Sequence, residues 1–150
     1  VRRVVGRVEL VANAQHHRLV ACGDAVVVAG VLQGEAPVVT RVSELANSPF
    51  FSMANPNNVY ALLVAFFMNN PAEFHRLDGE GYKFWVECVL KLDALNPQVA
   101  SRVARSLENW RRYTPQLSNL MFQALKHLER QEKLSVSVRE IVEKALNNPA

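Results

Sequence analysis

Gln98 and Arg102 are the two polar residues whose spacing most plainly allows them to act together. They lie four positions apart in the stretch LNPQVASRVARSL, residues 95–107. On an α-helix this spacing puts two side chains on one side, one turn apart, so their polar ends can reach the same small volume. A solvated helix flank, on which Arg102 forms only a salt bridge, explains the same pattern. On the residues alone this second interpretation is favoured.

Common catalytic motifs are missing from the sequence. It contains no HExxH, no G-x-S-x-G and no glycine-rich phosphate loop. The four histidines are not spaced as ligands on one helix face, and His127 is expected to be solvated. Cys22 and Cys88 lie far apart and outside any ligand spacing, so we expect reduced, buried thiols. The chain is therefore predicted to contain no catalytic residue, no metal site and no cofactor of its own.

The composition is that of a folded domain. The chain has 150 residues, of which 49% are hydrophobic and 21% charged, and this suits one domain with a substantial core. Its apolar runs are too short for a membrane span and its start lacks a signal-peptide pattern. We therefore expect no membrane partner and a cytoplasmic location. The formal charge of +3 permits an acidic partner without requiring one.

Helix starts recur from residue 40 onward. An asparagine or threonine that can accept a hydrogen bond from a free backbone N–H is followed by a proline, which fits the first helical position. This happens at Asn55-Pro56, Asn70-Pro71, Asn96-Pro97 and Thr114-Pro115. Each pair is predicted to begin a helix.

Apolar residues with a helical period follow these starts. One stripe is predicted to run through a single helix from Val99 to Trp110, and the segments 59–68 and 82–95 are apolar nearly all round. The predicted fold class is all-α, a superhelical stack of antiparallel helix pairs of the armadillo or HEAT type.

The last predicted helix has its own start signal. Ser137 and Glu140 form an S-x-x-E pattern, which predicts a capping box. Val136 and Ile141 are placed to form a hydrophobic staple around it.

The stretch FHRLDGEGYKF, residues 74–84, is predicted to be a helix end, a turn and the start of the next helix. The turn would pass through Gly79 and Gly81. Tyr82 and Phe84 would then enter the core.

Arginines beside aromatic residues in ENWRRYTP, residues 108–115, could bind nucleic acid. Trp110, however, belongs to the apolar stripe, and Arg111 and Arg112 suit the dipole at the end of their own helix. No wider basic face accompanies them. We therefore expect no nucleic-acid partner.

Four longer stretches carry a family resemblance. They are FFSMANPNNVYALLVAF, NPAEFHRLDGEGYKF, LDALNPQVASRVARSLENWRRY and LSVSVREIVEKAL. In this order they resemble the C-terminal helical domain of the aminopeptidase N family, the zinc-dependent alanyl aminopeptidases of the gluzincin group. The resemblance covers roughly residues 38–146 and implies one C-terminal α-helical domain over residues 38–150.

The resemblance implies a role beside a catalytic domain. In that family the helical domain closes over the catalytic domain and leaves a restricted channel for peptides. The zinc is held by an HExxH motif and a distant glutamate on the other domain. This chain alone is then expected to be inactive, with a zinc metalloaminopeptidase as its parent. Its partners would be a peptide substrate and the catalytic domain of the same parent chain.

The resemblance also assigns substrate-binding residues. In the NPQVA-x-R motif, Gln98 and Arg102 would face the catalytic cleft, the glutamine bordering the pocket for the first side chain of the substrate. Asn57 and Asn58 of the NPNN segment would also line the cavity. Since the family usually has an arginine where this chain has Asn58, a charged contact is expected to be lost or supplied elsewhere.

Residues 1–37 lie outside this resemblance. They are rich in valine, alanine and glycine, and residues 24–32 are β-prone. A divergent insertion and a mistranslated gene segment both remain open, and the second is preferred.

A stand-alone helical-repeat module that holds a protein partner on its concave face is the alternative function. An HExxH motif encoded upstream in the gene would distinguish the two functions.

Overall fold

The computed structural model describes residues 8–13, 16–21 and 37–147, with side chains from Pro37 onward. From Val38 to Asn147 every described element is helical, which confirms the predicted all-α class for this part of the chain. The chain divides into two compact units, residues 1–73 and 74–150. This boundary lies inside the segment 38–150 that the sequence predicts as one domain, and the division of the chain at residue 37 stays a prediction.

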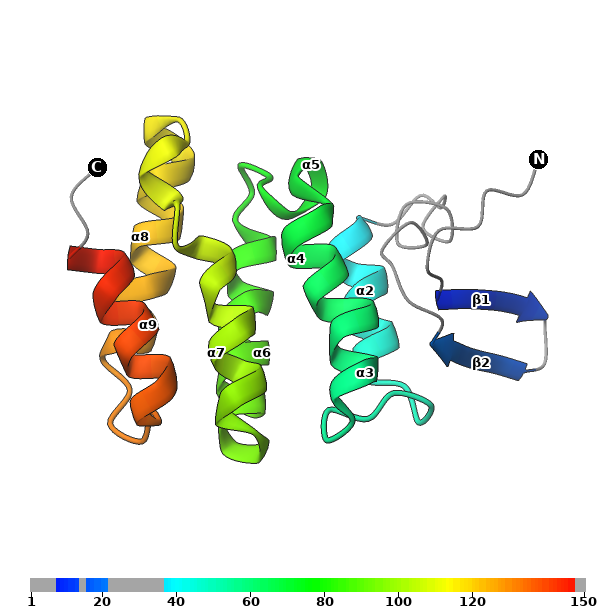
Figure 1. The fold of residues 1–150 in the computed structure, drawn as a ribbon. Coiled ribbons are helices and arrows are strands. Elements are labelled where there is room, and N and C mark those ends of the chain that lie inside the picture. Colours follow the sequence, from blue (N-terminus) through cyan, green and yellow to red (C-terminus); the bar gives the residue numbers. More distant parts are fainter. Residues whose placement is uncertain (1–7, 14–15, 22–36, 148–150) are drawn as a thin grey trace. The chain divides into compact units, whose positions relative to one another are not determined.

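Unit 1 begins with a β-hairpin (Figure 1). Strands β1 (Val8–Asn13) and β2 (His16–Ala21) pair antiparallel, and Val8 lies opposite Ala21 in their register. The sequence does not predict this pair of strands. The β-prone segment 24–32 and Cys22 lie outside the described residues.

The helical part of unit 1 contains a π-helical turn. It consists of α2 (Val38–Ala46), α3 (Pro56–Val59), the π turn η1 (Tyr60–Val64) and α4 (Ala65–Asn69). The last three follow one another directly, and α2 packs on η1. The sequence predicts a helix over 59–68 but not its π turn, because a segment that is apolar on all sides has no periodicity that one wider turn could disturb.

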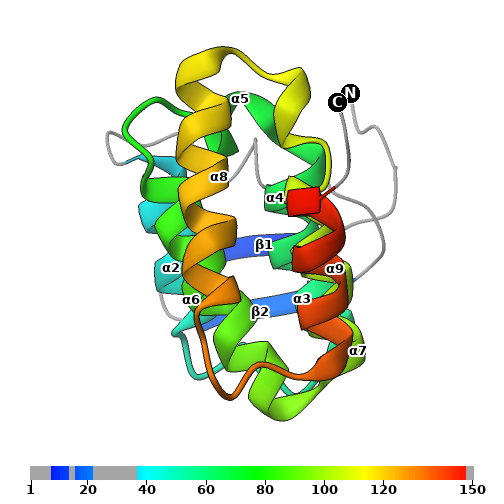
Figure 2. The same ribbon diagram turned by 90° about the vertical axis from the view of Figure 1, so that its left-hand side faces the viewer.

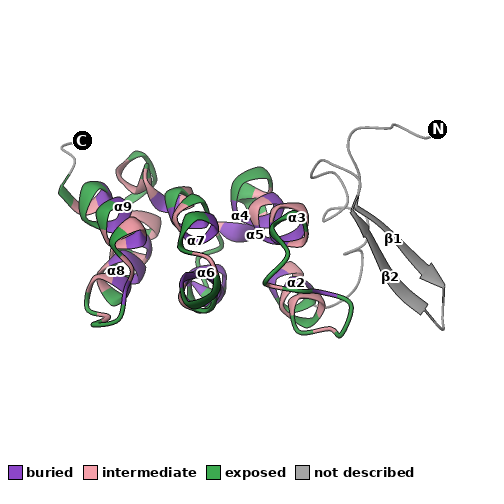
Figure 3. Ribbon diagram, turned by 60° about the horizontal axis from the view of Figure 1, so that its bottom comes forward, coloured by how far each residue is buried: buried purple, intermediate pink, exposed green. Residues whose placement is uncertain are grey.

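After α5 (Pro71–Phe74), unit 2 consists of two helix layers. Its elements are α6 (Glu80–Leu95), α7 (Pro97–Ala104), the 3₁₀ turns η2 (Arg105–Leu107) and η3 (Trp110–Arg112), α8 (Pro115–Glu129) and α9 (Val136–Asn147). Helix α6 packs beside α8, and α7 beside α9, as Figure 2 shows. Figure 3 shows buried positions on the inner sides of these helices. No helix among the described residues is long and apolar enough to cross a membrane.

The Asn-Pro and Thr-Pro pairs mark the starts of α3, α5, α7 and α8, as predicted. The Asn55 side chain accepts a hydrogen bond from the Asn57 N–H at 3.0 Å, and that of Asn96 from the Val99 N–H at 3.3 Å. Thr114 differs, because its side chain makes no capping hydrogen bond. Its backbone carbonyl accepts from the Ser118 N–H, the same first helical bond that the carbonyls of Asn55 and Asn96 accept.

The predicted single helix from Val99 to Trp110 is wrong, because α7 ends at Ala104. The chain continues through the two 3₁₀ turns, and Trp110 lies half-buried in the second of them. In η3 the Trp110 Nε1–H donates to the Ala145 carbonyl of α9 at 3.0 Å. This long-range hydrogen bond requires a side-chain direction that a continuous helix would not provide.

The Arg111 side chain binds the C-terminal end of α9 and not the end of the helix before it. Its two terminal nitrogens donate to the carbonyls of Ala145 at 2.8 Å and Leu146 at 2.5 Å. The last carbonyls of a helix have no intrahelical partner, so these bonds cap the C-terminal end of α9. The guanidinium also lies 4.2 Å from the centre of the Trp110 ring. The predicted contact of Arg111 with the dipole of its own helix is therefore wrong.

The capping box at Ser137 and Glu140 is also wrong. Helix α9 begins at Val136, and the hydroxyl of Ser135 accepts the hydrogen bond from the Val138 N–H at 3.3 Å. Val136 is 81% exposed, so it forms no hydrophobic staple. The start lies two residues earlier because Ser135 is bound by Asp93 of α6, through both its N–H and its hydroxyl.

The start of α6 needs both glycines, for different reasons. Gly79 has φ +74°, a left-handed backbone conformation that residues with a side chain rarely adopt. Gly81 lies in the first turn of α6 and not in the turn before it, and a Cβ there would collide with the carbonyl of Phe74. Tyr82 and Phe84 are buried as predicted.

Candidate functional site

Helix α7 is held firmly at both ends. Asn96 caps its start beside Pro97, and the buried Trp85 of α6 donates its indole N–H to the Val103 carbonyl at 3.1 Å. A capped helix whose buried face is bound to a neighbour makes a rigid support for the residues on its outer face. Ser101 adds a hydrogen bond from its hydroxyl to the Gln98 carbonyl at 2.9 Å.

Gln98 and Arg102 are both exposed on this helix, on the side away from the buried Val99 and Val103. The structure therefore places the predicted pair on one solvent-facing side, one turn apart, as the spacing requires. Their role in substrate binding stays a prediction.

Asn57 and Asn58 belong to unit 1, on the short helix α3. Asn57 is exposed and its N–H is bound to the Asn55 side chain. Asn58 is half-buried and lies directly before Val59 and the π turn. Because this pair lies in unit 1 and the α7 pair in unit 2, each pair is a separate candidate site.

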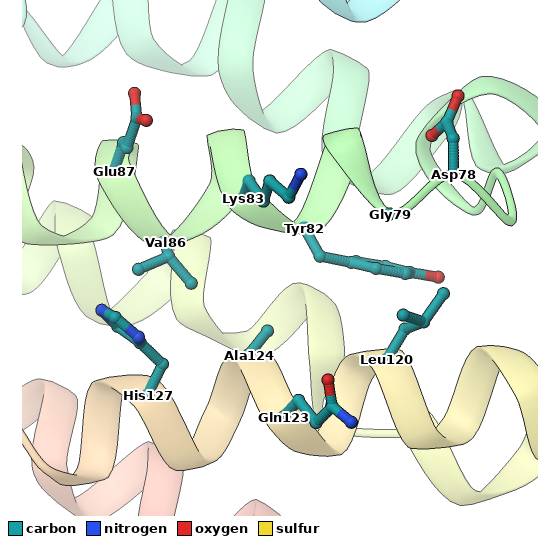
Figure 4. Close-up of a pocket in the computed structure, with 10 residues that line it drawn as sticks. All are labelled: Asp78, Gly79, Tyr82, Lys83, Val86, Glu87, Leu120, Gln123, Ala124 and His127. Atoms are coloured by element: carbon teal, nitrogen blue, oxygen red, sulfur yellow. The ribbon is translucent and has the colours of Figure 1, made fainter.

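A groove of about 420 Å³ lies between α6 and α8. Figure 4 shows Val86 and His127 pointing toward one another across it, with Ala124 on its floor. The Lys83 ammonium on its rim is bound to the Glu80 carboxylate at 2.6 Å. His127 is exposed, as predicted. Neither Gln98 nor Arg102 lines this groove.

Sequence reasoning missed a cluster around His75. The Nδ1 atom of His75 lies 2.9 Å from the Tyr82 hydroxyl, and its ring centre lies 4.4 Å from that of Tyr113. Burial lowers the pKa of His75 to about 4, so the ring is neutral at pH 7. Burial, and then the nearby Tyr113, raise the pKa of the Tyr82 hydroxyl, which is protonated. A neutral ring and a protonated hydroxyl form a stable hydrogen bond and not a reactive pair.

Residue spacing could not have indicated this cluster. His75 precedes the turn, Tyr82 belongs to α6 and Tyr113 follows η3. The turn at Gly79 and the 3₁₀ turns that follow α7 bring the three rings together.

The described residues contain no group of three or more His, Cys, Asp or Glu side chains that could hold a metal ion. Cys88 is a free, buried thiol, as predicted. Burial raises its pKa to about 12, so it stays protonated and unreactive. We derive no catalytic step from any of these residues.

Comparison with known families gives a match over most of the chain. The profile of a family described as a domain of unknown function (DUF3458_C) made of ARM repeats matches residues 12–147. The match therefore covers α2 to α9 and begins within the segment 1–37.

Curated relatives carry the name aminopeptidase N. The chain is 41% identical over 118 residues to that of Caulobacter vibrioides and 40% identical over 119 residues to that of Escherichia coli. Each alignment covers 77% of this chain and 14% of the relative. The chain thus spans about a seventh of the length of these relatives.

A solved structure has the same fold. The crystal structure of Legionella pneumophila aminopeptidase A in complex with aspartic acid matches with a TM-score of 0.69 and 33% sequence identity. The match covers 75% of this chain and 13% of that one.

Proposed function

The chain belongs to the DUF3458_C family of ARM-repeat domains and is homologous to the C-terminal region of aminopeptidase N. From this we propose that it is the C-terminal domain of a zinc-dependent aminopeptidase. The parent enzyme removes N-terminal residues from peptides. The part of this chain is to wall the channel that leads peptides to the catalytic domain.

One observation carries the proposal for this chain's own residues. Gln98 and Arg102 lie exposed, one turn apart, on a helix fixed by the Asn96 cap and the buried Trp85 hydrogen bond. Such a helix can hold an amide and a guanidinium at a defined place against a bound peptide. Gln98 borders the first side chain of the substrate, and Arg102 binds a polar group of the peptide.

The remaining contacts belong to the same proposal. Asn57 and Asn58 of unit 1 are a separate proposed contact to the peptide, in which Asn58 is neutral. The partners are a peptide substrate and the catalytic domain of the parent chain, with no nucleic acid or membrane, and the location is the cytoplasm. In this proposal zinc, which supplies an activated water for the hydrolysis, belongs to the catalytic domain.

Kinetics of the parent enzyme test this proposal. Gln98→Ala and Arg102→Ala should each raise KM or change the preference for the first residue, because they remove contacts to the bound peptide. A loss of about threefold to thirtyfold in kcat/KM is expected for one lost polar contact. The thermal midpoint of the enzyme should change little, since both residues are exposed.

Matched controls lie on α8. Gln116→Ala and Arg130→Ala remove the same two side-chain types from exposed positions. Kinetics that stay the same in the α7 variants, or change equally in the controls, would overturn the proposed contact.

A further inference from the structure

Arg105 extends the exposed face of α7 beyond the predicted pair. It is the C-cap residue of the helix and has helical dihedral angles, φ −63° and ψ −17°. The positions 98, 102 and 105 are therefore spaced i, i+4 and i+7, which is one row along one side of a helix. All three residues are exposed, while Val99 and Val103 on the opposite side are buried. The row thus presents one amide followed by two guanidinium groups.

Two acidic groups of unit 2 already have partners. The carboxylate of Glu108, the next acidic residue along the chain, lies 3.5 Å from the Lys144 ammonium of α9. Asp93 in the last turn of α6 is held by the N–H and hydroxyl of Ser135. The backbone of Arg105 is hydrogen-bonded to Ser101 and Glu108, whereas its guanidinium has no hydrogen-bond or ion-pair partner among residues 37–147. This exposed guanidinium can therefore bind a further anion.

We propose that Arg105, next to Arg102 on this row, binds a carboxylate group of the peptide substrate. Arginine presents a planar set of donors that matches a carboxylate with two parallel hydrogen bonds. The carboxylate is an acidic side chain or the free C-terminus of the peptide, and both have the same chemistry. The inference rests on the proposed function, in which α7 faces the peptide channel. It adds Arg105 as a residue that determines substrate specificity.

A comparison of three peptides in the parent enzyme tests the proposal. The first is a neutral peptide with an amidated C-terminus, the second replaces one neutral residue by aspartate, and the third has a free C-terminus. Arg105→Gln should lower kcat/KM by about fivefold for a peptide with a carboxylate, the size expected for one partly solvated ion pair. The rate for the neutral, amidated peptide should not change.

The two charged peptides identify the source of the carboxylate. A loss confined to the aspartate peptide assigns the site to acidic side chains, and a loss confined to the free C-terminus assigns it to the chain end. Added salt should weaken the preference of the unmodified enzyme for a peptide with a carboxylate over the neutral peptide, because an exposed ion pair is screened. Arg105→Glu should reverse this preference and favour a peptide in which lysine replaces the aspartate.

Arg130→Gln is the matched control, since it removes an exposed arginine from the end of α8. An equal loss in this variant would mean a general effect of net charge and would overturn the proposal. The proposal would also be overturned if Arg105→Gln left unchanged the ratio of kcat/KM for a peptide with a carboxylate to kcat/KM for the neutral peptide. That result is expected if Arg105 only stabilises the C-terminal end of α7.

The outcome is separable from that of the proposed function. If Gln98→Ala and Arg102→Ala alter kinetics on every peptide while Arg105→Gln changes no ratio, α7 faces the substrate and only the carboxylate site fails. If none of the three variants has an effect, the proposed function fails as well.

Discussion

Among single residues, His75 has the most unusual environment. It is half-buried, its ring packs on Phe74, Tyr82 and Tyr113, and its Nδ1 atom is hydrogen-bonded to the Tyr82 hydroxyl. These neighbours from α5, α6 and the segment after η3 are aromatic, and none supplies a carboxylate that would favour a positive ring. The protonated form of His75 is therefore disfavoured in the folded chain.

This environment predicts a loss of stability in mild acid. The pKa of His75 is about 4 in the folded chain, against about 6.5 for an unfolded histidine. Between these values the unfolded chain binds a proton that the folded chain does not, so the free energy of unfolding falls as the pH is lowered from 6.5 to 4. Above pH 6.5 the residue is neutral in both states and contributes no pH dependence.

Urea unfolding at a series of pH values measures the effect. For a partly exposed ring we expect a loss of about 1–2 kcal/mol across this window. His75→Phe keeps the aromatic packing and removes the titrating group. The free energy of unfolding of the unmodified chain minus that of the variant should be constant above pH 6.5 and should fall as the pH is lowered below it. A constant difference from pH 4 to 7 would contradict the assignment.

At the scale of elements, α6 and α9 are joined by one buried acidic residue. Asp93 is 8% exposed, and its carboxylate accepts hydrogen bonds from the N–H of Ser135, at 2.8 Å, and from its hydroxyl. The same hydroxyl accepts from the Val138 N–H in the first turn of α9. Asp93 therefore fixes the residue that caps α9.

Removing this carboxylate should weaken both contacts. Asp93→Ala leaves two donors of Ser135 without their partner and frees the cap to move, so we expect a loss of about 2–3 kcal/mol in the free energy of unfolding. Glu87→Ala, at an exposed position of the same helix, should stay within about 0.5 kcal/mol. Chemical denaturation of the two variants makes the comparison, and equal losses would contradict this role of Asp93.

Helix starts that rest on neighbouring residues could be predicted, and those that rest on distant ones could not. Asn55 and Asn96 cap the helices that follow them directly, so their sequence pattern is sufficient. The start of α9 depends on Asp93, 42 positions before Ser135. The local S-x-x-E pattern of Ser137 was therefore outweighed by a tertiary hydrogen bond.

The same distinction applies to the candidate site. The exposed pair Gln98 and Arg102 follows from local spacing on a helix that begins where the sequence indicates. The end of that helix at Ala104 could not be predicted, because Trp110 and Arg111 turn away to bind the last carbonyls of α9. The place of Arg105 on the same exposed row depends on this helix end.

At the scale of the whole molecule, the chain corresponds to a small part of its relatives. It spans 14% of the aminopeptidase N relatives it matches. Its described residues provide an exposed polar row on a rigid helix but no set of metal ligands. The proposed function, with binding on this chain and chemistry on the catalytic domain, predicts that the two can be separated by experiment.

The 150-residue chain alone should therefore hydrolyse no peptide. With added zinc, release of p-nitroaniline from an alanine anilide should stay at the rate of buffer with zinc, because hydrolysis needs ligands that hold the metal and leave a position open for water. The parent enzyme, assayed at the same molar concentration, is the positive control. Hydrolysis by the isolated chain that rises to a plateau at one zinc per chain, and is abolished by a chelator, would contradict the proposed role. It would place a metal site within this sequence and make the helical domain an enzyme in its own right.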